Sequence, residues 1–465
     1  MKRFLTLLAL FCYLSCACVS AQSKAPATLF EQQEKYQQAG LLYLTANACL
    51  ASYNDRVGNI FYTFLQHDGW RSQRIKQSGQ IADANLFIAS RLDEVTGKTT
   101  YILALRGTAS KKDLKLDKRT RRVLFAGSSI GELSENAGKA ETTDAQPRVH
   151  RGFLQYTLAA LAVDVEDESR VAQSKRFYEL LKEDSGSKLI ITGHSLGGAA
   201  AVLYAASLIN FGIEPERIQL VTYGAPAVGN EAFAQAYKDN IKLLRVYSTL
   251  DPIPGGLQSL FHNYVQFGSL FAVQSDPHLR ILQHSMENYA DMMGKHYYNC
   301  KQAAIDEGII PQDPMQSDAG TGKTIAVALL PPEDVYSLPD SKYAVANLLD
   351  TYRWSFPRYR ILTVADTGAS KQELTELARR SGADVLLTAR IGISRVKTSK
   401  YWVVSLDQGL FTTDGDILSG LTHSVRLKEG ASIFQASAYN GFKAVEMLGD
   451  LDAELIRPLD HLVSE

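Results

Sequence analysis

A serine between two glycines, at a predicted change from strand to helix, is the residue of this chain best suited to nucleophilic chemistry. Residues 193–197 read Gly-His-Ser-Leu-Gly, between the apolar run 188–192 and the alanine-rich run 198–207. So sharp a turn leaves room only for glycine around Ser195, and it exposes the hydroxyl at the carboxyl edge of a sheet. The helix N-terminus at Leu196 directs free N–H groups to the same spot. The pattern predicts acyl transfer, with a purely structural turn as the alternative.

A serine hydroxyl needs a histidine that removes its proton and an acid that orients the histidine. In folds with this turn the chain order is serine, then aspartate or glutamate, then histidine. Asp251 follows the apolar run 243–250 and precedes Pro-Ile-Pro254, which end the predicted strand. Its carboxylate should therefore reach the same sheet edge as Ser195. We predict that Asp251 is the acid; a turn-forming role is the alternative.

Four histidines follow Asp251 before the chain changes in composition, namely His262, His278, His284 and His296. His284 directly precedes the predicted helix 285–293, so its imidazole should lie where a loop meets a helix N-terminus. We predict that His284 is the general base. The alternative is that it is an ordinary surface or core histidine.

An acyl transfer site also needs donors for the oxyanion of the tetrahedral intermediate. One predicted donor is the backbone N–H of Leu196, directly after the nucleophile. The other is Thr108, which ends the predicted strand at Leu105-Arg-Gly-Thr108 and offers both an N–H and a hydroxyl. An ordinary threonine at a strand end is the alternative.

The length of 465 residues allows two or three domains. The chain should be globular, because 45% of its residues are hydrophobic and can form sizeable cores. The formal net charge is −1, so there is no strong positive field, and we expect no nucleic-acid partner. After residue 21 no apolar run is long enough to span a bilayer.

The N-terminus predicts export. Residues 1–3 are Met-Lys-Arg, 4–18 are mostly apolar and 19–21 are small, which is typical of a secretory signal cleaved after Ala21. The expected location is the periplasm or the medium, and a lipid anchor at Cys16 or Cys18 is the alternative. Cys49 and Cys300 remain after cleavage, and an oxidising compartment permits a bridge between them, although two cysteines do not establish one.

Strands and helices alternate along the first part of the chain. A helix is predicted over 30–53 and a hairpin over 85–91 and 100–105. The apolar runs 189–191, 218–222 and 243–247 then alternate with helical stretches near 177–182 and 199–211. This order predicts an α/β fold around a mostly parallel sheet.

A linker-like segment at 311–322 divides the predicted first domain, 22–310, from a second, smaller α/β domain at 323–465. In the second domain we expect strands at 324–330, 359–364, 384–391 and 401–406, helices at 344–352 and 433–456, and a helix with a capping box at Ser370-Lys-Gln-Glu373. No catalytic set is evident in it.

Five ordered motifs resemble those of the class 3, fungal-type triacylglycerol lipases. They are Leu105-Arg-Gly-Thr108, Val149-His-Arg-Gly-Phe153, Gly193-His-Ser-Leu-Gly-Gly198, Tyr223-Gly-Ala-Pro226 with Val228-Gly-Asn230, and Asp251-Pro-Ile-Pro254. The resemblance covers about residues 30–297. It implies an α/β-hydrolase fold, action on carboxylic esters without a metal or organic cofactor, Ser195 as nucleophile, Asp251 as acid and Thr108 in the oxyanion hole. His284 is similar to the late His-x-x-x-x-Tyr site of the family.

The resemblance also implies a mobile lid, here within residues 109–148. A basic stretch, 111–122, precedes the apolar Val123-Leu-Phe125, a combination that predicts contact with an anionic lipid surface. A solvated helix face is the alternative.

The C-terminal unit resembles, more loosely, small α/β domains of bacterial envelope lipoproteins that activate penicillin-binding proteins, and the N-terminal domain of the Tol-system propeller protein. An envelope protein is therefore its expected partner.

Together these features predict an exported serine carboxylic ester hydrolase, a lipase that cleaves acylglycerol or related lipid esters through an acyl-enzyme on Ser195. The alternative is a catalytically silent envelope binding or scaffold protein on a lipase-like fold, because a fold alone does not establish turnover. Labelling by a fluorophosphonate, which requires an activated serine, distinguishes the two.

Overall fold

The computed structural model describes residues 26–448, except 68, 79–82, 108–120, 141, 167–173, 255–262, 276–282, 314–322, 335–339, 357–358, 365–368, 396–400 and 429–431. The predicted signal sequence and Thr108 therefore lie outside the described residues. Within the described ranges, no helix has the length and apolar character needed to cross a bilayer.

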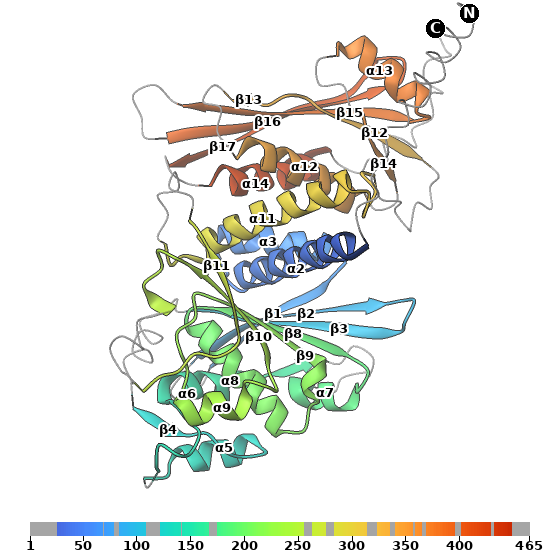
Figure 1. Cartoon of the computed structure of the whole chain (residues 1–465). Coiled ribbons are helices and arrows are strands. Elements are labelled where there is room, and N and C mark those ends of the chain that lie inside the picture. Colours follow the sequence, from blue (N-terminus) through green and yellow to red (C-terminus); the bar gives the residue numbers. More distant parts are fainter. Residues whose placement is uncertain are drawn as a thin grey trace, which may run out of the picture.

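A seven-stranded sheet forms the centre of the first unit, in the order β1-β2-β3-β8-β9-β10-β11 (Figure 1). The strands are β1 (Arg71–Ser78), β2 (Asp83–Asp93), β3 (Lys98–Leu105), β8 (Lys188–His194), β9 (Ile218–Tyr223), β10 (Lys242–Ser248) and β11 (Ser269–Val273). The first three are antiparallel and the remaining pairings are parallel. The predicted hairpin and mostly parallel sheet are confirmed. Because parallel strands end at one edge, the segments after β3, β8 and β10 meet there.

Helices cover both faces of this sheet, as in α/β-hydrolase folds (Figure 1). One face carries α6 (Arg151–Leu161), α7 (Phe177–Glu183), α8 (Leu196–Asn210) and α9 (Glu231–Tyr237), with the short 3-10 helix η1 (Pro215–Arg217) before β9. The other face carries α2 (Pro26–Ala51), α3 (Arg56–His67) and α11 (Met286–Asp306). The first thirteen residues of α8, from Leu196 to Leu208, are buried. Its alanines allow this close approach to the sheet, which fixes the start of the helix beside β8.

The segment between β3 and α6 contains two short strands and a helix. β4 (Arg122–Leu124) pairs with β5 (Arg148–His150), and α5 (Ile130–Ala137) lies between them in the chain. Val123, Leu124 and Phe125 are buried, and the ring of Phe125 packs edge-on against Phe233 at 5.3 Å between centroids. The expected apolar strip of the lid is thus packed in the core. A second hairpin joins β6 (Asp164–Glu166) and β7 (Ser174–Arg176).

The second unit has its own sheet, in the order β14-β12-β15-β16-β17, with β13 beside β15. Its strands are β12 (Thr324–Leu329), β13 (Glu333–Asp334), β14 (Arg360–Thr363), β15 (Val385–Arg395), β16 (Tyr401–Thr412) and β17 (Ile417–Lys428). α12 (Ser341–Ser355) and α14 (Ile433–Leu448) cover one face and α13 (Lys371–Arg380) the other (Figure 1). The predicted capping box at Ser370 and Glu373 is confirmed.

The two units share one layer of packed helices. α2, α3 and α11 lie between the first sheet and α12 and α14 (Figure 1). A single buried cluster joins residues of α2, α3 and α11 with Phe434 and Phe442 of α14, and Phe64 meets Trp354 of α12 at 4.2 Å between ring centroids. The predicted boundary at 311–322 stays a prediction, since 314–322 lie outside the described residues. The units on either side of it are nevertheless in close contact.

The two cysteines that follow the predicted signal sequence are free thiols. Cys49 lies in the core, where its Sγ is 3.2 Å from the hydroxyl of Thr192. Burial raises the pKa of this thiol to about 12, which keeps it protonated and unreactive. Cys300 is partly buried on α11.

Candidate active site

Ser195 occupies the sharp turn between β8 and α8. Its backbone has φ 56° and ψ −125°, and among the described residues it alone combines a positive φ with a side chain. A β-carbon on Gly193 would lie 2.3 Å from the carbonyl oxygen of Gly197, and one on Gly197 would lie 2.0 Å from that of Leu105. Strand, helix and the end of β3 therefore approach each other as closely as glycine permits. This geometry holds the Ser195 hydroxyl at the carboxyl edge of the sheet.

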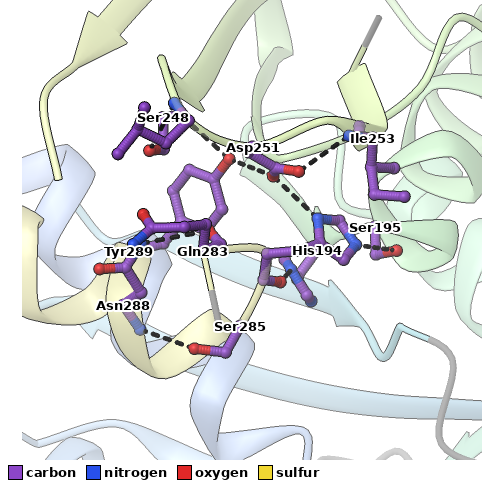
Figure 2. Close-up of polar contacts among 12 residues, drawn as sticks. His194, Ser195, Ser248, Asp251, Ile253, Gln283, Ser285, Asn288 and Tyr289 are labelled. Carbon is purple, nitrogen blue, oxygen red and sulfur yellow. Dashed lines mark hydrogen bonds and ion pairs between the residues drawn. The ribbon is translucent and has the colours of Figure 1, made fainter. Parts of the chain in front are cut away.

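The structure brings Ser195, His284 and Asp251 together from three distant parts of the chain. Figure 2 shows Ser195 and Asp251 at the two ends of this chain of hydrogen bonds. His284 Nε2 lies 2.7 Å from Ser195 Oγ, and His284 Nδ1 lies 2.8 Å from Asp251 Oδ2. An ionised carboxylate only accepts hydrogen bonds, so Nδ1 carries the imidazole proton and Nε2 accepts from the serine hydroxyl. This chain of two hydrogen bonds is the arrangement in which a histidine activates a serine.

The carboxylate of Asp251 is fully buried and held by three donors. Besides His284, the hydroxyl of Tyr289 donates to Oδ2 at 2.6 Å, and the backbone N–H of Ile253 donates to Oδ1 at 2.9 Å. Burial by itself raises the pKa of Asp251, but these hydrogen bonds outweigh it and hold the pKa below its usual value. Asp251 is therefore ionised at neutral pH. Its negative charge can stabilise the imidazolium that forms when His284 takes the serine proton.

Tyr289 is the tyrosine of the His-x-x-x-x-Tyr pattern that begins at His284, but the sequence alone predicts no role for it. Its hydroxyl donates to Asp251 and also accepts from the buried backbone N–H of Ser248 at 3.0 Å (Figure 2). It thus ties the first turn of α11 to the end of β10 and to the acid. The sequence signal for it is its position five residues after His284, on the first turn of the predicted helix.

Replacing Tyr289 by phenylalanine removes a donor from Asp251 and leaves the buried N–H of Ser248 without an acceptor. We expect kcat for ester hydrolysis to fall about 10-fold and the free energy of unfolding to fall by about 1–3 kcal/mol. Steady-state kinetics and urea unfolding measure both. The control is Tyr237→Phe, which removes a hydrogen bond to Asn210 outside the site. Equal kcat values for the two variants would contradict the role of Tyr289.

His194, inside the glycine-serine motif, is a second residue whose role the sequence did not indicate. Its Nε2 lies 2.8 Å from the backbone oxygen of His284, and its Nδ1 lies 3.2 Å from the hydroxyl of Tyr53. The carbonyl only accepts, so Nε2 carries the proton and Nδ1 accepts from Tyr53. Burial, followed by the nearby His284, lowers the pKa of His194 to about 3. His194 is therefore a neutral residue that fixes the backbone of His284.

This buried histidine makes stability depend on pH. The unfolded state binds a proton to His194 below about pH 6.5, whereas the folded state binds one only near pH 3. The free energy of unfolding therefore has its full value above pH 6.5 with respect to this group, and it decreases as the pH falls toward 3. In His194→Gln the free energy of unfolding should fall less steeply over this range, by up to about 1.4 kcal/mol per pH unit. Urea unfolding at pH 7, 6, 5 and 4 measures the slopes. Parallel curves for parent and variant would show that His194 does not contribute.

The two predicted oxyanion donors are only partly within the described residues. Leu196 is the first residue of α8, so its N–H is one of the helix-terminal donors that lack a partner inside the helix. Thr108 lies outside the described residues. Gly107, directly before it, lies against the turn, since a β-carbon there would be 2.6 Å from the carbonyl oxygen of His194. The oxyanion role of both residues stays a prediction.

The remaining candidate histidines are not brought to the site by the described structure. His296 lies on α11, where its ring packs at 5.2 Å from that of Phe271. His262 and His278 lie outside the described residues. No group of three or more histidine, cysteine, aspartate or glutamate side chains in the described part of the chain is arranged to hold a metal ion.

Comparison of the sequence with known proteins shows which family the segment around the site resembles. Residues 102–257 match the sequence model of the family described as Lipase (class 3). This segment belongs to the class 3 lipases. It contains Ser195 and Asp251, whereas His284 follows it in the chain. The predicted resemblance is confirmed for this segment, and the looser one of the C-terminal unit stays a prediction.

The relatives of this class 3 lipase segment differ in how much of each chain they cover. Toxin TseL of Vibrio cholerae is 39% identical over 106 residues, 23% of this chain and 14% of the toxin. Phospholipase A1-Igamma2 (chloroplastic) of Arabidopsis thaliana is 26% identical over 237 residues, 47% of this chain and 40% of that protein. The chain thus spans less than half the length of these relatives. The Rhizomucor miehei lipase propeptide complex is 23% identical with a TM-score of 0.36, covering 51% of this chain and 68% of that chain.

Proposed function

We propose that the protein is an exported serine hydrolase of carboxylic esters and that its substrates are lipid esters. The observation that carries the proposal is the hydrogen-bonded chain from Ser195 Oγ through His284 to the buried Asp251 carboxylate. Membership of residues 102–257 in the class 3 lipase family supports the same chemistry.

The proposed reaction has two halves. Ser195 Oγ attacks the ester carbonyl carbon while His284 Nε2 takes the hydroxyl proton, and Asp251 stabilises the resulting imidazolium. The oxyanion is held by the N–H of Leu196 and by Thr108. The tetrahedral intermediate collapses, the alcohol leaves with the proton from His284, and the acyl group remains on Ser195. Water then attacks the acyl carbon while His284 Nε2 takes its proton. The second tetrahedral intermediate collapses, the proton returns to Ser195 Oγ, and the carboxylic acid is released.

Apolar side chains beside the acid support a lipid substrate. Leu250 directly precedes Asp251 and Ile253 follows two residues after it, and these side chains are 61% and 37% exposed. They offer a surface to an acyl chain. The names of the family and of the relatives point to lipid esters, and we propose acylglycerols and phospholipids as the two substrate classes.

Hydrolysis of nitrophenyl esters from four to sixteen carbons, beside triacylglycerol and phospholipid emulsions, tests this proposal. We expect hydrolysis of the esters with kcat/KM rising with chain length, because the acyl chain buries apolar surface at the site. The emulsion rates then distinguish the two lipid classes. A folded protein that hydrolyses none of these substrates would contradict the proposed function.

Export and surface contacts are part of the proposal and have separate tests. The mature protein should begin at Gln22 when its N-terminus is sequenced, whereas a lipid-modified cysteine at 16 or 18 would establish the anchored form.

Sedimentation with anionic vesicles tests membrane contact through the basic stretch. It compares the parent with a variant in which three lysines are replaced by glutamate, namely Lys111, Lys112 and Lys115. Weaker sedimentation of the variant is expected. We also propose an envelope protein as the partner of the C-terminal unit, and cross-linking on intact cells tests it.

A further inference from the structure

Helix α11 connects the site to the C-terminal unit. It begins at Met286, two residues after His284, and its first turn carries Tyr289, which donates to Asp251. A shift of this turn therefore moves the base and the support of the acid together. Misplacement of a catalytic group by about 1 Å can cost 100-fold in rate. What holds the first two turns of α11 thus bears directly on the chemistry.

The N-terminus of α14 holds these two turns. Gln435 Nε2 donates to the backbone oxygen of Glu287 at 2.8 Å, three residues after His284. Ser432 Oγ donates to Asp291 Oδ1, one turn further along, and accepts from the backbone N–H of Gln435 at 3.1 Å. Each of these two side chains thus bonds to one of the first two turns of α11, and the Ser432 side chain also fixes the backbone of Gln435.

The packing around these contacts is tight and leaves little freedom. A β-carbon on Gly294 would lie 2.6 Å from Cε1 of Phe434, so α14 approaches α11 at a point where only glycine fits. The carboxylate of Asp291 is fully buried and pairs with Lys295 at 2.8 Å. Lys295 also pairs at 2.7 Å with Asp340, the residue before α12. Two helices of the second unit, α12 and α14, therefore hold the N-terminal half of α11, the half that follows His284.

We propose that Gln435 and Ser432 are positioning residues for His284 and Tyr289, which makes the C-terminal unit part of the hydrolytic machinery. Neither residue touches the reacting atoms; they act through the backbone of Glu287 and the carboxylate of Asp291. The proposal assigns to the second unit a role that its sequence did not show. The proposal rests on the proposed function only in that hydrolysis is one of its readouts.

The first test replaces each residue by a side chain without the donor. Gln435→Met keeps the volume and length of the side chain, and Ser432→Ala removes a single hydroxyl. In each we expect kcat for a short-chain ester to fall about 10-fold while KM stays within about 2-fold, because alignment of His284 is lost and the substrate surface is not.

A matched control exists on the same interface. Tyr343 of α12 accepts a hydrogen bond from Asn299 Nδ2 at 3.1 Å. Asn299 lies on α11 roughly 18 Å beyond Glu287 at 1.5 Å per residue. Tyr343→Phe removes one hydrogen bond between the units, far from His284. Its kcat should equal that of the parent.

Fluorophosphonate labelling separates positioning from unfolding and from failure of the proposed function. Parent and variants should reach the same final stoichiometry, which counts folded sites, while the labelling rate constant falls about 10-fold in Gln435→Met and Ser432→Ala only. A reduced stoichiometry with an unchanged rate constant would show that the two residues merely stabilise the fold and would overturn the inference. Parental rates in both variants would overturn it as well. A folded parent that is neither labelled nor active would instead refute the proposed function.

Discussion

Ester hydrolysis by the Ser195→Ala variant is expected to fall by at least about 10⁴-fold in kcat, with no loss of the fold. The Ser195 hydroxyl, which donates a hydrogen bond to His284 Nε2 at 2.7 Å, is the nucleophile that this geometry supplies to the substrate. Without it, catalysis is limited to what the oxyanion donors and substrate binding provide. Alanine adopts the φ of 56° at this turn no more easily than serine does, so the strain of the turn is kept. Initial rates on a soluble ester, beside circular dichroism, measure the effect.

A matched serine lies on the same helix. Ser207 is buried on α8, and its hydroxyl donates to the backbone oxygen of Leu203 at 2.8 Å. Ser207→Ala makes the same chemical change away from the site and should keep kcat within about 2-fold of the parent. If Ser195→Ala retained activity close to that of Ser207→Ala, the assignment of the nucleophile would be wrong.

The Asp251→Asn variant is expected to lose about 10³ to 10⁴-fold in kcat. The neutral amide cannot stabilise the imidazolium, and it can donate to Nδ1, which favours the tautomer in which Nε2 carries the proton and cannot accept from Ser195. The N–H of Ile253 keeps its acceptor in the asparagine oxygen, and the amide nitrogen that replaces Oδ2 can donate to the hydroxyl of Tyr289, so the loop should keep its shape. Steady-state kinetics on the same soluble ester measure the loss.

An exposed carboxylate provides the control for this change. Asp144 pairs with Arg148 at 3.0 Å at the surface, where such pairs contribute little. Asp144→Asn should therefore leave kcat unchanged. A loss of less than 10-fold in Asp251→Asn would indicate that another group orients His284.

Local sequence was sufficient to predict the turn at Ser195 because the constraint there is local. Gly193 and Gly197 lie two residues before and two residues after the serine, and the strand and helix on either side have clear patterns. A second local signal, the helix predicted directly after it, distinguishes His284 from the other three histidines. In the structure Ser285 is the N-cap of this helix, α11, and its Oγ accepts from the backbone N–H of Asn288. The structure places this histidine, and not His296, between Ser195 and Asp251.

The supporting residues could not be predicted because their roles depend on contacts over long distances in the chain. Nothing near Tyr53 or His194 in the sequence shows that these residues meet, or that both support His284. The hydrogen bond from Gln435 to the backbone of Glu287 joins positions 148 residues apart and depends on which faces of α11 and α14 meet.

Some strands escaped prediction for more ordinary reasons. β1 has a single large apolar residue, Ile75, and is an edge strand. β17 lies at the edge of the second sheet and is polar on its outer face. It nevertheless alternates buried or half-buried Leu421, His423 and Val425 with exposed neighbours, a period of two that a closer reading of the sequence could have used.

The most direct measurement of the central claim is the location of a fluorophosphonate adduct by peptide mass spectrometry on the folded, full-length protein. The account predicts one adduct per chain, on Ser195, and none in the His284→Ala variant, because the hydroxyl is reactive only with the imidazole beside it. An adduct on another residue, or none on a folded parent chain, would contradict it.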